Sequence, residues 1–261
     1  MRITALFTLL SVASCRPAPA TDDLARLFAD DLTVVDLTHS VSADAPFWPG
    51  PDQSPFRHDT LSAHEDGAPS MAAYAAPEHF GTHFDAPVHG GMGLPSVDQI
   101  PTQELFGPAV VIDVSVPAST DEDYALTAED VLAWEAEHGA IPAGAIVLMR
   151  SGWPARWDEG DEYYNADAEG RLHFPGFAES AARLLVDERE IAGIGVDTGS
   201  VDPGNADGFP VHGIVNGAGY FHLENLADLR SLPASGSYLV VAPIKIQGGS
   251  GGQVRVFAVI P

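Results

Sequence analysis

Three histidines and a carboxylate lie within eleven residues of the chain, in the stretch HFGTHFDAPVH at positions 79–89. They are His79, His83, Asp85 and His89. A helix would place His79 and His83 on one face but turn Asp85 away, and the prolines and glycine in and before the stretch resist helix formation. In an extended chain these odd-numbered residues all point to one side. The stretch therefore predicts a strand that presents nitrogen and oxygen ligands to a metal ion.

The candidate ligands are imidazoles and a carboxylate, with no thiolate. This set suits zinc, manganese or iron and does not by itself choose among them. A single histidine is often a hydrogen-bonded core residue instead, but three of them in eleven positions favour a shared metal.

A second motif, GGSGG at positions 248–252, fits the G-x-S-x-G pattern of a nucleophilic serine. That hydrolase fold requires an aspartate and then a histidine after the serine, whereas the last histidine of this chain is His222. We therefore expect these glycines to form a tight loop near the site, where the backbone must approach its neighbours closely.

The elements that must position the site are mostly strands. Apolar, β-branched segments typical of buried strands lie at residues 32–37, 108–114, 145–149, 191–196 and 253–260. Thr127, the acidic residues after it and an apolar stripe predict a helix over residues 127–138, and a second helix is expected at 177–186. Many strands with few helices, and no internal repeat, indicate one α/β domain on a mixed sheet.

Composition excludes several classes of partner. The chain has 12 basic and 37 acidic residues and a formal net charge of -25, so nucleic acids and anionic lipid surfaces are poor partners for the folded part. Its one cysteine, Cys15, cannot form a disulfide within the chain.

The first residues are typical of a targeting segment. Arg2 precedes a short apolar run that ends in small residues before Cys15, which indicates a secretory signal and not a spanning helix. The ending resembles the lipobox of bacterial lipoproteins, in which the cysteine becomes the lipidated first residue; the alternative is a signal cleaved elsewhere. We expect a signal at 1–15, a linker with a short helix at 16–30, and a domain at 31–261, exported and lipid-anchored in the periplasm or outer membrane.

The eleven-residue stretch resembles the H-x-G-T-H-x-D-x-P-x-H signature of the cyclase family of metal-dependent hydrolases, which includes bacterial kynurenine formamidases and isatin hydrolases. Further likeness lies at residues 36–39, 48–50, 148–153, 195–203 and 243–251, so that the resemblance covers roughly residues 31–261. It implies a single α/β domain with a mixed, partly barrel-like sheet flanked by a few helices, of the swivelling β/β/α type.

By this resemblance His79, His83 and Asp85 are metal ligands, joined by His212 and Glu224. Members of the family bind one or two ions, such as zinc or manganese, and the aspartate can bridge them. The resemblance also implies a homo-oligomer.

The partner of Glu224 is ambiguous from local sequence. His222 alternates with Glu224 on a predicted strand, while His212 lies twelve residues before it, as in the family. The family spacing favours His212 and leaves His222 a role behind the ligands or on the surface. His89 resembles the family's catalytic histidine, which is expected to take a proton from the attacking water and return it to the leaving nitrogen.

The predicted activity is hydrolysis of a C–N bond in a small (aryl)formamide or cyclic amide by metal-activated water. The aryl group is expected to rest on Trp48 or Phe47 in a proline-rich loop, although Trp48 could equally pin that loop to the core. Gly90 and Gly91 stand where relatives often carry an aromatic residue, which together with export argues against a kynurenine formamidase. The alternatives are a lactone or ester hydrolase with the same site, or an envelope lipoprotein that binds metal or ligand without catalysis.

Overall fold

The computed structural model describes residues 32–50, 55–64, 67 and 69–261. The predicted signal, Cys15 and the linker with its short helix lie outside the described residues. Residues 33–261 form one unit, to which the following elements belong. In the described part of the chain no helix is both long and apolar enough to cross a membrane.

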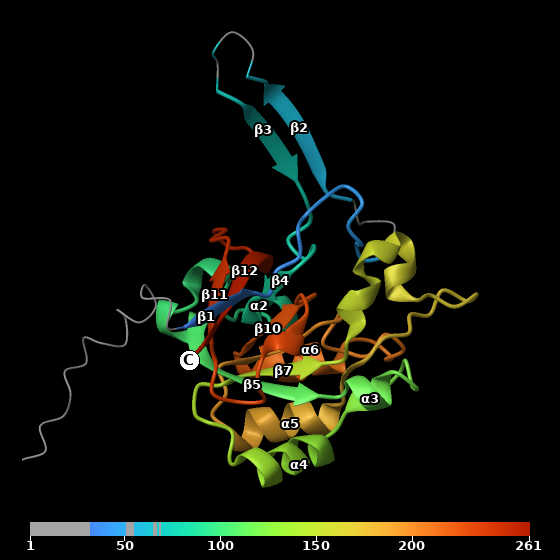
Figure 1. The fold of residues 1–261 in the computed structure, drawn as a ribbon, viewed down its shortest axis with the longest axis vertical. Helices are drawn as coiled ribbons and strands as arrows, with labels where there is room; N and C mark the ends of the chain where they lie inside the picture. Colours follow the sequence, from blue (N-terminus) through green and yellow to red (C-terminus); the bar gives the residue numbers. More distant parts are fainter. Residues whose placement is uncertain (1–31, 51–54, 65–66, 68) are drawn as a thin grey trace, which may run out of the picture. The chain divides into compact units, whose positions relative to one another are not determined.

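The centre of the fold is a mixed sheet that closes on itself (Figure 1). Its strands, in spatial order, are β1 (Thr33–Asp36), β12 (Gly251–Ile260), β11 (Tyr238–Pro243), β5 (Phe106–Asp113), β7 (Ile146–Arg150), β9 (Gly193–Val196), β10 (Phe221–Glu224) and β4 (His83–Asp85). Strands β5, β7, β9 and β10 run parallel, and the other pairings of this sheet are antiparallel. The predicted α/β domain with a partly barrel-like mixed sheet is thus confirmed.

The long strand β12 closes the ring. Its first residues, Gly251 to Gln253, pair with β4, while Val254 and the residues after it pair with β11. Strand β1 adds to the far half of β12. Because strands twist along their length, the two ends of one long strand can serve different neighbours.

The parallel strands are buried on both faces, as their apolar sequences predict. Along β5, Ala109 and Val111 pack into the interior of the ring with residues of β4, β10 and β12, whereas Val110 and Ile112 pack on the outer face against helices. Those helices are α4 (Ala128–His138) and α5 (Glu179–Glu188), which lie side by side next to β5 and β7 (Figure 1).

Helix α4 begins as predicted. The side chain of Thr127 accepts a hydrogen bond from the amide of Asp130, and the Asp130 carboxylate accepts one from the amide of Thr127. This reciprocal capping satisfies two otherwise unpaired amides at the helix start.

Short elements complete the domain. The helical ones are α2 (Pro87–Gly90), η1 (Val97–Gln99), η2 (Thr102–Leu105), α3 (Ser115–Ala118), η3 (Trp153–Tyr164), α6 (Pro210–Val215), η4 (Asn216–Ala218) and η5 (Leu229–Ser231). Two small sheets pair β6 (Ala125–Leu126) with β8 (Gly176–Phe177) and β2 (Arg57–Ser62) with β3 (Met71–Ala75). Helices α2 and α6 contact one another and carry histidines to the region of β4 and β10.

Candidate active site

The eleven-residue stretch adopts three conformations in succession. His83 and Asp85 lie on β4, but His79 lies in a bend before it, and Gly81 turns the chain with a φ of 64°. After the strand, a proline at the first helical position starts α2, and His89 lies on that turn. The prediction of one extended strand is therefore wrong outside β4, because proline is well tolerated at a helix start.

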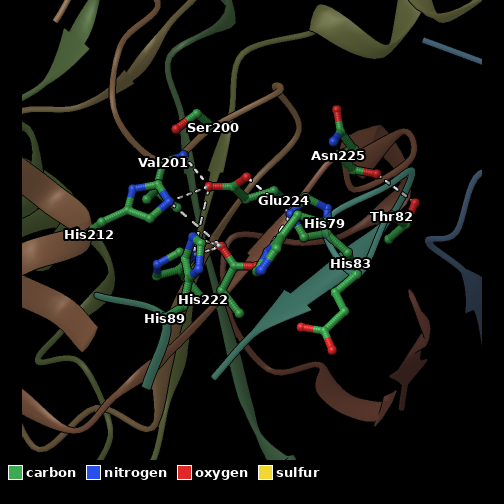
Figure 2. Close-up of polar contacts among 12 residues, drawn as sticks. His79, Thr82, His83, His89, Ser200, Val201, His212, His222, Glu224 and Asn225 are labelled. Atoms are coloured by element: carbon green, nitrogen blue, oxygen red, sulfur yellow. Dashed lines mark hydrogen bonds and ion pairs between the residues drawn. The ribbon is translucent and has the colours of Figure 1, made fainter. Parts of the chain in front are cut away.

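Strand pairing brings the second half of the site to the first. In the antiparallel pair of β10 and β4, Glu224 lies opposite His83, and His222 lies opposite Asp85. His212 comes from α6. Figure 2 shows the labelled histidines and Glu224 pointing toward one another. The structure therefore brings together all the residues predicted as metal ligands, and adds His222 to them.

Asp85 stands between two groups of histidines. Its Oδ1 atom faces His79 Nδ1 at 2.5 Å and His83 Nε2 at 3.3 Å. Its Oδ2 atom faces His222 Nδ1 at 3.0 Å and His212 Nε2 at 3.7 Å. Asp85 is only 1% exposed, so its charge is balanced almost entirely by these neighbours and not by water.

Glu224 spans the same two groups. Its Oε2 atom faces His83 Nε2 at 3.3 Å, whereas Oε1 faces His212 Nε2 at 3.5 Å and His222 Nδ1 at 3.7 Å. The amide of Val201 donates a hydrogen bond of 2.9 Å to Oε1 and fixes the carboxylate. Two candidate positions for a cation thus lie side by side and share one aspartate.

The hydrogen bonds made by the ring nitrogens that point away from the cluster fix the tautomers of the histidines. His83 Nδ1 donates to the carbonyl of Gly81 at 2.8 Å, and His212 Nδ1 donates to Asp202 Oδ2 at 2.6 Å. Both partners only accept hydrogen bonds, so the proton must lie on Nδ1 in each ring. In the neutral rings the Nε2 atoms therefore present lone pairs to the carboxylates, as metal-ligating histidines do.

His79 is fixed in the same way from the glycine-rich loop. Its Nε2 lies 2.9 Å from Ser250 Oγ, and the Ser250 hydroxyl donates its own hydrogen to Glu78 Oε2 at 2.6 Å. Ser250 must then accept from His79 Nε2, so that in the neutral ring the Nδ1 lone pair faces Asp85. A Cβ at Gly251 would lie 2.7 Å from His79 Cε1, so the predicted close approach of this loop is confirmed.

These donors fit a divalent cation. Lone pairs and carboxylate oxygens repel one another at such distances unless positive charge lies between them. In the described part of the chain His83 Nε2, Asp85 Oδ2 and His222 Nδ1 are buried without a hydrogen-bond partner. Burial alone would lower the pKa of His83, but the charges of Asp85 and Glu224 outweigh it and raise that pKa to about 9. A positive charge would therefore stabilise the site, and its carboxylate oxygens and imidazole nitrogens are suitable ligands for a divalent cation.

His89 is placed differently from the ligands. Its ring stacks on His79 at 4.0 Å between centroids, its Nε2 lies 4.0 Å from Asp85 Oδ2, and its side chain is 32% exposed. Within the described residues that side chain makes no hydrogen bond that would fix a proton. Desolvation lowers the pKa of His89 to about 4, in spite of the opposing effect of Asp85, so the ring is a neutral base at neutral pH.

A cavity of about 410 Å³ opens onto the cluster. One wall is aromatic: Trp48 packs edge-on against Tyr164 at 5.4 Å and lies 6.0 Å from Phe209. Trp48 thus both lines the cavity and anchors its loop. Phe47 is not among the described residues that line this cavity, whereas Tyr164 and Phe209 are. A volume of this size suits a small molecule.

Gly90 also lines the cavity, but packing explains it better than substrate does. A Cβ at this position would lie 2.8 Å from the carbonyl oxygen of His212 and 2.9 Å from Asn216 Cβ. The glycine therefore lets α2 approach α6 and η4 closely.

Sequence reasoning missed the outer partners of the histidines. Asp202 lies in a stretch that resembles the family but had no role assigned to it, and Asn216 carried no local signal, because their contacts depend on which elements pack together. The surface role considered for His222 is wrong, since that side chain is fully buried. Its alternation with Glu224 was the signal that could have placed it in the cluster.

The site contains a buried cluster of histidines and two carboxylates. Beside it lie His89, whose side chain makes no hydrogen bond to the described residues, and a cavity with an aromatic wall. Together these features define a metal-dependent hydrolase site. Comparisons with known proteins agree. The Cyclase family model, described as a putative cyclase, matches residues 35–203. An isatin hydrolase from Roseibium aggregatum is 35% identical over 254 residues, which cover 91% of this chain and 95% of the relative. A kynurenine formamidase from Salinibacter ruber is 25% identical over 224 residues, covering 86% and 96%.

Solved structures give the same result. An isatin hydrolase bound to the product analogue thioisatinate has a TM-score of 0.88 and 33% identity, covering 94% of this chain and 100% of that one. Isatin hydrolase A from Labrenzia aggregata, bound to benzyl benzoate, has a TM-score of 0.86 and 39% identity, covering 92% and 98%. The chain therefore belongs to the cyclase family of metal-dependent hydrolases. It is an amide hydrolase of that family.

Proposed function

We propose that this protein hydrolyses the amide C–N bond of a small aryl compound, with a cyclic aryl amide as the preferred substrate and an aryl formamide as the second. The observation that carries the proposal is the arrangement of His89 beside the cluster: a neutral base with no fixed hydrogen bond, next to ligands whose lone pairs all converge. A protein that only binds metal would not need such a base.

We further propose zinc or manganese as the cation, bound as one or two ions. His79, His83 and Asp85 would hold the first, and Asp85, His212 and Glu224 the second. When bound, a divalent cation lowers the pKa of water toward neutrality and polarises a carbonyl oxygen.

His89 would move the proton. As a neutral imidazole it accepts a proton from the attacking water and then donates it to the nitrogen that leaves the carbonyl carbon. Asp85, 4.0 Å from His89 Nε2, would stabilise the imidazolium formed in between. The stacked ring of His79 limits how far His89 can swing away.

The aromatic wall supports the choice of an aryl substrate. Trp48, Tyr164 and Phe209 offer ring faces and edges at one side of the cavity, while the histidines and carboxylates line the other. The higher identity to an isatin hydrolase than to kynurenine formamidases supports the cyclic amide over the formamide.

The test is hydrolysis of isatin and N-formylkynurenine by protein stripped of metal and then reloaded with zinc or manganese. We expect activity only in the loaded protein, and a loss of about 10²–10⁴-fold in His89→Ala at unchanged metal content. The matched control is His138→Ala at the end of α4, which should keep full activity. Loaded protein that hydrolyses lactones or esters but not amides would refute the proposal in favour of that alternative.

Location and assembly are separate proposals. We propose export and lipid anchoring at Cys15, supported by the signal-like residues before it, and a homo-oligomer, supported by analogy with the family. Cell fractionation of Cys15→Ala tests the first, because that variant should leave the membrane fraction. Size-exclusion chromatography with light scattering tests the homo-oligomer, because it measures the molar mass of the assembly.

A further inference from the structure

His222 has the surroundings of a ligand, although the family spacing selects His212. It lies on β10 directly opposite Asp85 and is fully buried. Its Nδ1 atom points at Asp85 Oδ2 across 3.0 Å and lies 3.7 Å from Glu224 Oε1. The ring packs edge-on against that of His212 at 4.5 Å. His212 Nε2 and His222 Nδ1 both face Asp85 Oδ2 and Glu224 Oε1, and Figure 2 shows the two rings near Glu224.

The hydrogen bonds behind the ring determine its tautomer. Asn216 Nδ2 donates to the carbonyl of Tyr220 at 3.0 Å, and a carbonyl can only accept. This fixes the orientation of the Asn216 amide, so that its Oδ1 atom faces His222 Nε2 at 3.1 Å. Nε2 must therefore carry the hydrogen, and Nδ1 of the neutral ring is left as a bare lone pair.

A bare lone pair pointed at a carboxylate oxygen at 3.0 Å is repulsive, and neither atom has another hydrogen-bond partner in the described part of the chain. We propose that His222 is a metal ligand through Nδ1. It completes a cation position whose other protein ligands are Asp85, His212 and Glu224. Asn216 is the positioning residue that holds the ring. This inference rests on the proposed metal dependence and assigns His222 a role within it.

The assignment gives the two cation positions different characters. Four protein ligands saturate a tetrahedral ion, as in structural sites, whereas three leave a place for water or substrate. Both positions border the cavity, because His212 and Glu224 line it as well as His79, His83 and Asp85, whereas His222 is absent from the described residues that do so. By the number of protein ligands, the position with three would keep a place for water or substrate, and the position that includes His222 would be the tighter one.

Metal binding tests the inference independently of activity. Zinc is titrated into metal-free wild type and His222→Gln by calorimetry, and bound zinc is counted by elemental analysis after gel filtration. We expect two ions per chain in wild type, and in His222→Gln one ion retained with the other bound at least ~10-fold more weakly. His138→Gln, the same substitution at the end of α4, is the control and should bind like wild type.

Asn216 supplies a second pair of variants in case His222→Gln does not fold. Asn216→Ala removes the acceptor for Nε2 and should weaken one of the two binding events by ~10–100-fold, whereas Asn216→Asp keeps an acceptor and should retain it. Two ions bound with wild-type affinity in both His222→Gln and Asn216→Ala would overturn the assignment and make His222 a doubly protonated partner of Asp85. Wild type that binds neither zinc nor manganese would refute the proposed function as well, so the two failures are distinguishable.

Discussion

Asp202 offers the sharpest test of how the metal centre is held, because it touches a candidate ligand but not the reacting groups. Its carboxylate is 2% exposed and accepts from the amide of Val211 at 2.7 Å, the amide of His212 at 3.2 Å and His212 Nδ1 at 2.6 Å. The perturbation is Asp202→Asn, which keeps the shape of the side chain and removes its charge.

The expected losses follow from these contacts. An asparagine has one acceptor oxygen, so its NH2 group must face either the Val211 amide or His212, which leaves at least one buried donor unpaired at about 1–3 kcal/mol. Loss of the charged partner also makes His212 a weaker base and frees its ring. Metal ligands that lose such a partner typically lose ~10–100-fold in metal affinity.

Two assays separate the effects. Denaturant unfolding with excess chelator should show the loss of stability, and competition with a chromophoric chelator should show the loss of metal affinity. The matched control is Asp123→Asn, because Asp123 pairs with His173 at 2.9 Å, outside the cluster. The reasoning is refuted if Asp202→Asn binds metal within about twofold of wild type, or if Asp123→Asn weakens binding equally.

Two further predictions concern stability and specificity. Burial raises the pKa of Asp197 to about 6 although Ser151 and Gly152 donate to it, so the folded state favours the neutral acid. The stability that Asp197 contributes through this preference is fully present below the pKa of aspartate in the unfolded chain and is lost as the pH rises through about 6. The unfolding free energy should therefore fall by up to about 3 kcal/mol between about pH 4 and 7. Urea unfolding of Asp197→Asn should lack this fall, and parallel pH profiles would contradict the reasoning. Trp48→Ala should lower kcat/KM by ~3–10-fold for aryl amides but less for aliphatic formamides, because only the former lose a ring contact. Equal losses, or a changed melting temperature, would point to its contact with Tyr164 instead.

The sequence was sufficient for the local features of this fold. Burial of β5 and β7 on both faces follows from their apolar sequences, and Thr127 with Asp130 starts α4 where the spacing predicts. The types and spacing of His79, His83 and Asp85 likewise indicate a metal without any knowledge of the fold. These features depend on residues close together in the chain, whose interactions recur in any context.

The tertiary structure decided how those residues act together. His79 depends on Ser250, 171 positions away, and Glu224 meets His83 only because β10 pairs with β4 in one register. A shift of that register by one residue would turn Glu224 to the other face of the sheet. The sequence alone determined which groups could bind a cation. Closure of the β-sheet and long-range hydrogen bonds determined which nitrogen of each histidine carries its lone pair and where that lone pair points. Those depend on partners brought together by packing, and no local pattern encodes them.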